Sequence, residues 1–112
     1  MARHEQKIYL VRHGETQWSL SGQHTGVSDI PLTENGRMAA RLLKPVLSGE
    51  SFALVLTSPL QRARETCELA GLGGRAMVEP ELAEWKYGDY EGITTAQIRA
   101  TRPEWSATRA SI

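Results

Sequence analysis

The chain of 112 residues has the length of one small domain, and it carries 13 basic and 13 acidic side chains. This balance excludes a protein that works by neutralising nucleic acid or an anionic membrane surface, so we expect a small molecule as the partner. No segment holds the roughly 18 consecutive apolar residues that a membrane-spanning helix needs. We therefore expect residues 1–112 to form a single soluble domain.

The N-terminal segment and the cysteine content indicate a compartment. Residues 1–7 are polar and lack the apolar stretch of a secretory signal. Cys67 has no second cysteine with which to form an internal disulfide. We expect the protein to work in a reducing cytoplasm.

The first predicted element is a buried strand at Ile8 to Val11, a short apolar run that ends abruptly at Arg12 and His13. His13 is therefore expected at the C-terminal end of a strand. A loop rich in glycine and serine follows over residues 19–31.

A helix is predicted from Thr33 to Leu47 by apolar residues at helical spacing, with Thr33 as its N-cap. Pro45 lies late in this stretch and lacks a backbone donor. We expect the regular helix to end or kink near Lys44.

A second buried strand is predicted at Phe52 to Leu56. Ser58 follows it as a candidate N-cap, and Gln61 completes a capping box of the Ser-x-x-Gln type. The helix that starts here should run to about Ala70, where Gly71 ends it.

A third strand at Arg75 to Val78 and a short helix at Thr95 to Arg102 complete the predicted elements. Strands that alternate with helices predict an α/β fold with a parallel sheet. In such sheets ligands bind outside the carboxyl ends of the strands. His13 and residues 58–62 each follow a strand, so they should converge on one ligand-binding edge.

The residues at this edge suit a phosphate group, which requires guanidinium groups and free backbone N–H groups. Arg62 lies in the first turn of its helix, where the helix dipole adds to its own charge. Arg12 comes from the neighbouring strand end. A histidine between two arginines should be disfavoured in its protonated form, which leaves His13 as a neutral nucleophile.

A general acid is also needed to protonate the leaving group, and a carboxyl group beside a phosphate retains its proton more readily. Glu84 is the candidate, because it follows the third apolar stretch and is flanked by aromatic residues. Local sequence alone does not distinguish it from Glu81 or Glu91.

Other chemistries find less support. His4, His13 and His24 show no paired metal-ligand spacing, so we expect no metal and no cofactor. The glycines at positions 71, 73 and 74 end a helix instead of opening one, which argues against a dinucleotide-binding loop.

Three motifs in this order resemble those of the histidine phosphatase superfamily, which includes the phosphoglycerate mutases. They are Arg12-His13-Gly14-Glu15-Thr16, Ser58-Pro59-Leu60-Gln61-Arg62-Ala63, and Glu84 with Tyr87-Gly88-Asp89-Tyr90-Glu91-Gly92. The segment from Trp18 to Thr33 is similar to the branch that holds sedoheptulose bisphosphatase-like and acid phosphatase-like members. The resemblance implies a phosphoglycerate mutase-like fold with three layers, a mostly parallel sheet flanked by helices.

The resemblance also implies roles for the candidate residues. His13 would become phosphorylated, and Arg12 and Arg62 would hold the phosphoryl group. Glu84 would protonate the leaving group and then activate water.

Further positions are matched by the resemblance. Thr25 and Gly26 match positions that approach the substrate, and Tyr87 matches a position near the acid. Ser19 stands where mutases typically have an asparagine that reaches the phosphate. A serine can donate there with a shorter reach, which favours a phosphatase over a mutase.

The main departure from the family is at the C-terminal end. Family members are much longer, and their second half supplies a further strand and a second histidine to the phosphate pocket, which no residue after Trp105 provides. Loss of one charged donor typically costs ~3 kcal/mol of transition-state stabilisation. We therefore expect a truncated domain, incomplete at its C-terminus, with an exposed sheet edge that favours self-association.

The leading hypothesis is a phosphomonoester hydrolase that acts through a phosphohistidine on a small phosphorylated metabolite. A second hypothesis is a truncated, weakly active or inert chain that binds phosphate ligands. A third is a phosphoglycerate mutase, which Ser19 disfavours.

Overall fold

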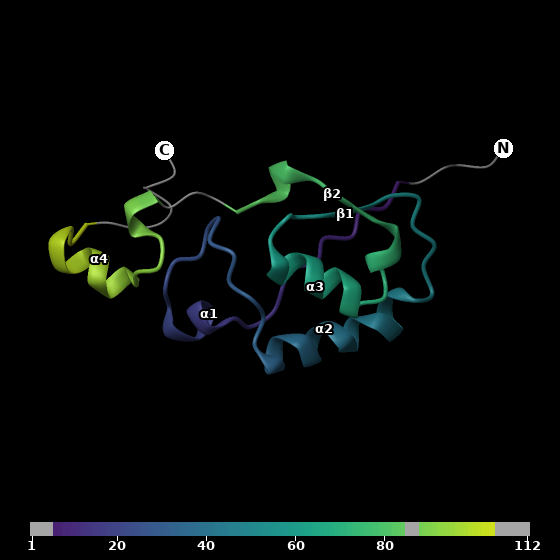
Figure 1. Ribbon diagram of the computed structural model, residues 1–112, viewed down its shortest axis with the longest axis horizontal. Coiled ribbons are helices and arrows are strands. Elements are labelled where there is room, and N and C mark those ends of the chain that lie inside the picture. Colours follow the sequence, from purple (N-terminus) through teal and green to yellow (C-terminus); the bar gives the residue numbers. More distant parts are fainter. Residues whose placement is uncertain (1–5, 85–87, 105–112) are drawn as a thin grey trace.

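A computed structural model describes residues 6–84 and 88–104, and their helices and strands alternate along the chain (Figure 1). Helices and strands are, in order, α1 Gln17–Ser21, α2 Glu34–Leu47, β1 Val55–Thr57, α3 Gln61–Leu69, β2 Ala76–Val78 and α4 Thr95–Thr101. Short 3-10 turns lie at Gly73–Arg75, Pro80–Leu82 and Gly88–Tyr90. β1 and β2 pair in parallel, with Leu56 opposite Met77. The predicted α/β fold with parallel strands is confirmed.

Helix α2 begins as the sequence predicts and ends later. The Thr33 hydroxyl accepts a hydrogen bond from the backbone N–H of Gly36 at 3.2 Å, which makes Thr33 the N-cap. The helix continues over Pro45 to Leu47, so the predicted end near Lys44 is wrong. Pro45 lies in the last turn, where it removes one backbone bond, and the bond that closes the helix, from the Ser48 N–H to the Lys44 carbonyl, is formed at 2.9 Å.

Helix α3 begins two residues later than the capping-box pattern predicts. Leu60 is its N-cap, and the Ser58 hydroxyl accepts only from the Leu60 N–H, at 3.3 Å. Ala70 is the C-cap, and Gly71 adopts the left-handed conformation that ends the helix, as expected. Strand β1 is also shorter than predicted and starts at Val55.

The loop predicted over residues 19–31 begins inside a short helix instead. Helix α1 begins with a capping box. The Thr16 hydroxyl accepts from the Ser19 N–H, and the Ser19 hydroxyl accepts from the Thr16 N–H. Its C-cap, Gly22, is left-handed. The rest of the segment forms a bridge at Gln23 and bends over residues 26–28 before it leads into α2.

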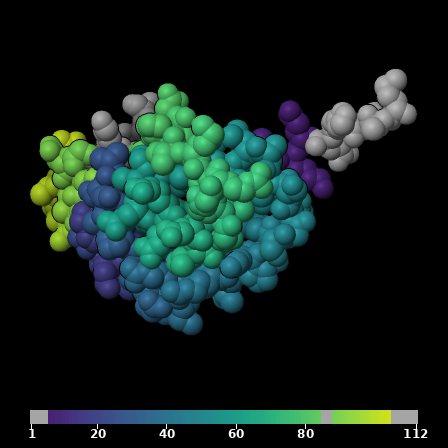
Figure 2. Space-filling view, turned by 45° about the vertical axis from the view of Figure 1, so that its right-hand side comes forward, coloured from purple at the N-terminus to yellow at the C-terminus, as the bar shows by residue number. Residues whose placement is uncertain are grey.

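The predicted first strand, Ile8 to Val11, is not formed. Ile8 and Leu10 are 84% and 93% exposed, and within the described ranges no backbone hydrogen bond joins this run to another segment. Figure 2 shows the start of the described chain, in purple, at the rim of the molecule. An apolar run becomes a strand only where a neighbouring strand pairs with it, and here that neighbour is missing.

One face of the small sheet is also uncovered. Helices α2 and α3 lie on the same side of β1 and β2 (Figure 1). Parallel sheets are normally covered by helices on both faces. Large apolar side chains are left exposed on and next to the strands and along one stripe of α2: Leu54, Leu56, Met77 and Val78, and Met38, Leu42 and Val46.

Two glycines allow the start of α2 to contact the segment that carries His13. A Cβ atom added to Gly36 would lie 2.3 Å from the Glu15 carbonyl oxygen, and one added to Gly14 would lie 3.2 Å from the Gly36 Cα. The Thr33 N–H donates to the same Glu15 carbonyl at 2.9 Å. The backbone at Gly14 and Glu15 is therefore packed directly against α2.

We predict that Gly36→Ala destabilises the fold by about 1–3 kcal/mol, because the new methyl group must displace backbone atoms. Gly49→Ala is the matched control, since nothing lies within 4 Å of its added Cβ. Urea denaturation followed by circular dichroism measures both variants. Equal stabilities for the two would contradict the close approach.

Candidate active site

The buried guanidinium of Arg62 is the centre of the candidate site. The residue is 1% exposed, and three of its N–H groups are engaged. Nε donates to His13 Nε2 at 3.2 Å, Nη1 to the Ser28 carbonyl at 2.6 Å and Nη2 to the Gly26 carbonyl at 2.6 Å. A guanidinium carries five N–H donors, so two remain for a ligand.

Helix α3 directs Arg62 into this position from its first turn. The Asp29 carboxylate accepts from the Gln61 N–H at 2.7 Å, and the Gln61 side-chain amide donates to the Asp29 carbonyl at 2.8 Å. The helix start therefore receives its capping contact from a residue 32 positions earlier, which the local pattern at Ser58 could not reveal. One turn later the Thr66 hydroxyl donates to the Arg62 carbonyl at 2.7 Å.

The contacts of His13 define its tautomer. Nδ1 lies 2.9 Å from the Gly14 carbonyl oxygen, and because a carbonyl only accepts, Nδ1 carries the proton. Nε2 then holds a lone pair, which accepts from Arg62 Nε. A protonated ring would place an N–H of His13 against the N–H of Arg62. This contact thus favours the neutral imidazole that the sequence predicts.

Carboxylates surround the buried cation. Burial lowers the pKa of Arg62 below its ordinary value, while the charges of Glu84, Asp29 and Glu91 raise it, Glu84 most among them. The structure therefore brings Glu84, which is exposed, within electrostatic reach of Arg62. Its role as the acid stays a prediction.

Arg12 and Ser19 are less clearly placed for a phosphate. Arg12 is exposed and makes no hydrogen bond or ion pair with the residues described. The Ser19 hydroxyl donates its one proton to the Thr16 carbonyl at 2.9 Å within the capping box of α1. Donation from Ser19 to a phosphate would require that bond to break, so both roles stay predictions.

The resemblance assigns substrate contacts to Thr25, Gly26 and Tyr87. The first two lie at the loop whose carbonyls accept from Arg62. Gly26 is buried, and its carbonyl accepts from Arg62. The Thr25 hydroxyl donates to the Gln23 carbonyl at 3.3 Å. Tyr87 lies outside the described residues. The carbonyl of Gly26 thus helps to hold Arg62. The substrate contacts of Thr25, Gly26 and Tyr87 remain predictions.

Glu91 is a site residue whose position the sequence did not reveal. One carboxylate oxygen accepts from the Val27 N–H at 3.1 Å, and the other accepts from the Ser28 hydroxyl. Sequence reasoning considered Glu91 only as an alternative acid. Contacts over more than 60 positions leave no local pattern, although the residue lies within the third motif.

The comparison with known proteins agrees with this geometry. The model of the histidine phosphatase superfamily, branch 1, matches residues 8–111. This chain belongs to that family. The contact of His13 with Arg62, and the charge of Glu84 acting on Arg62, are thus features of a histidine phosphatase chain.

Other histidine phosphatases resemble this one in sequence and structure. An acid phosphatase of Mycobacterium tuberculosis is 45% identical over 88% of this chain, and sedoheptulose 1,7-bisphosphatase of Saccharomyces cerevisiae is 38% identical over 82%. Some other relatives are named phosphoglycerate mutases. A solved structure from an open reading frame of M. tuberculosis superposes with a TM-score of 0.74 at 45% identity, covering 84% of this chain and 49% of that one.

The matched relatives are longer than this chain. It covers 49% of the mycobacterial acid phosphatase and 40% of the yeast bisphosphatase. The chain therefore spans about half or less of the length of these curated relatives. The site residues described above therefore correspond only to the matched part of these relatives.

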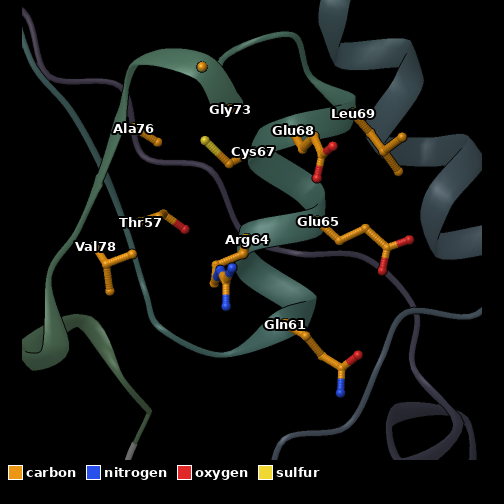
Figure 3. A pocket seen from close by; sticks show the side chains of 11 residues that line it. Thr57, Gln61, Arg64, Glu65, Cys67, Glu68, Leu69, Gly73, Ala76 and Val78 are labelled. Atoms are coloured by element: carbon orange, nitrogen blue, oxygen red, sulfur yellow. The ribbon is translucent and has the colours of Figure 1, made fainter.

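The histidine phosphatase chain has a further cavity on the other side of α3, about 790 Å³ in volume. Figure 3 shows Arg64 and Cys67 on the side of α3 toward the strands, with Thr57 facing them. Arg64 lines this cavity and Arg62 does not, because side chains two positions apart on a helix project to nearly opposite sides. This cavity is therefore separate from the candidate phosphate site.

The two other histidines, His4 and His24, have no predicted role in the phosphate site. His24 Nε2 lies 3.3 Å from the Thr95 hydroxyl, and His4 lies outside the described residues. Over residues 6–84 and 88–104, no group of three or more histidine, cysteine or acidic side chains could hold a metal ion. None of the helices in these ranges is long and apolar enough to cross a membrane.

We predict that Asp29→Ala destabilises the protein by about 1 kcal/mol, because the start of α3 loses its capping carboxylate. Exposed Asp89, mutated to alanine, is the control. Thermal melting measures both. If Asp29→Ala melts like the control, Asp29 does not support the helix that carries Arg62.

Proposed function

We propose that this chain supplies the nucleophile and phosphate-binding part of a phosphomonoester hydrolase, as one truncated domain acting on a small phosphorylated metabolite. The observation that carries the proposal is the contact between His13 Nε2 and Arg62 Nε. It presents a lone pair on a neutral imidazole beside a buried cation with two spare N–H donors. The single cysteine favours a reducing, cytoplasmic setting.

In the first step, the phosphoryl oxygens bind Arg62 and Arg12, and an oxygen takes over the Nε–H of Arg62. This exchange frees the lone pair of His13 Nε2, which attacks phosphorus while the bond to the ester oxygen breaks. Glu84 gives its proton to the leaving alkoxide. The products are an alcohol and a phosphohistidine.

In the second step, Glu84, now a carboxylate, takes a proton from water, and the resulting nucleophile attacks phosphorus. The bond between phosphorus and Nε2 breaks, phosphate leaves, and His13 returns to its neutral form. Thr25, Gly26 and Tyr87 would line the substrate side of this site, with Ser19 as a further donor. No resident cofactor is required.

A second candidate is a chain that binds phosphate ligands without turnover. The position of Arg12 favours it, because this second guanidinium is exposed and has no hydrogen bond or ion pair with the described residues that would hold it at the site. A mutase is disfavoured, since the Ser19 proton is already donated to Thr16.

We expect incubation with a ³²P-labelled phosphomonoester to trap an acid-labile, base-stable phosphoprotein that is absent in His13→Ala. Circular dichroism shows whether the variant is folded. Label with release of phosphate supports the hydrolase, and bound phosphate without label supports the second candidate. A wild-type chain that neither binds phosphate nor takes up label would exclude both.

We further propose that the chain associates with itself through its uncovered sheet. Leu56 and Met77 lie exposed and opposite each other on the two strands, and exposed Leu54 directly precedes β1. Among the described residues no further strand pairs with this sheet, so its edges are open to a second copy.

We expect concentration-dependent dimers in sedimentation velocity, which Leu56→Lys should dissociate. Exposed Leu82→Lys, outside the strands, is the control. A monomer at all concentrations that melts sharply at high temperature would contradict this proposal.

A further inference from the structure

The position of the Arg62 guanidinium depends on a loop that has no regular secondary structure. Two of the three bonds to the guanidinium come from the carbonyls of Gly26 and Ser28, on either side of Val27. Residues 26–28 lie in neither a helix nor a strand. A loop can present two carbonyls in fixed directions only if something else holds its backbone.

The carboxylate of Glu91 contacts the same three-residue stretch. It accepts from the Val27 N–H at 3.1 Å and from the Ser28 hydroxyl. Both oxygens are used, so the carboxylate bridges two adjacent residues of the loop. Glu91 is half-buried, and its charge also acts on Arg62.

Glu91 is itself held in place by backbone bonds. The Gly92 N–H donates to the His24 carbonyl, and the His24 N–H donates to the Ile93 carbonyl, each at 2.9 Å. Gln23 adds a side-chain bond to the Gly92 carbonyl at 2.6 Å. These bonds join residues 23–24, just before loop 26–28, to residues 92–93, just after Glu91, so the backbone that carries its carboxylate is fixed next to the loop.

We infer that Glu91 is a positioning residue of the phosphate site: its carboxylate fixes loop 26–28, whose carbonyls direct the Arg62 guanidinium toward His13 Nε2. This inference rests on the proposed function for its catalytic meaning. It assigns Glu91 a role other than the general acid. In this role Glu91 acts through the loop.

The test compares Glu91→Ala and Glu91→Gln with Glu104→Ala, an exposed acidic residue at the other end of the same C-terminal segment. Nitrogen-detected NMR of the Arg62 Nε–H and the His13 ring reports the contact directly. Isothermal titration with inorganic phosphate reports the binding site. Glutamine retains an acceptor for Val27, so it separates geometry from charge.

We expect Glu91→Ala to shift the Arg62 Nε–H and His13 Nε2 resonances and to weaken phosphate binding by about tenfold, the usual size when an orienting contact is lost. Glu91→Gln should restore most of both, and Glu104→Ala should match the wild type. If Glu91→Ala is unfolded, the same comparison is made with Glu91→Gln and Glu91→Asp, and the shortened Asp should then show the shifts.

Unchanged Arg62 and His13 resonances in a folded Glu91→Ala or Glu91→Asp chain would overturn the inference. A wild-type chain that binds no phosphate would instead count against the proposed function, while the NMR comparison still decides the role of Glu91. The two failures are therefore distinguishable.

Discussion

The burial of one positive charge determines the arrangement of this site. A guanidinium removed from water is costly unless its donors are paired, and Arg62 satisfies three of them. Its partners come from segments that are far apart in the sequence, namely His13, Gly26 and Ser28. The same hydrogen bonds that make burial tolerable also bring a nucleophile and a cation together. Structure and chemistry here depend on one set of contacts.

The parts of this arrangement that sequence could predict are those set by local patterns. Thr33 caps α2 and Gly71 ends α3 because hydroxyl groups and a left-handed glycine act within a few residues. The proximity of His13 and Arg62 was also predicted, because each follows an apolar run and the ends of parallel strands meet at one edge; the contact forms although the first of these runs is not a strand. These inferences needed no knowledge of distant contacts.

The features that the sequence did not predict depend on contacts between distant positions. The start of α3 depends on Asp29, and the loop around Arg62 depends on Glu91, both through bonds between distant positions. The run Ile8 to Val11 has the composition of a strand, but strand formation is decided by a partner and not by composition. Helix α2 continues over Pro45 because a proline in the last helical turn removes only one backbone bond.

The contact between α2 and α3 has a consequence for the site itself. Gly36 places the start of α2 against the backbone next to His13, and α3 carries Arg62. Arg37 of α2 forms an ion pair with Glu65 of α3. The separation between imidazole and guanidinium is therefore determined by how two helices pack, so a substitution that only tilts one helix would alter reactivity without touching either group.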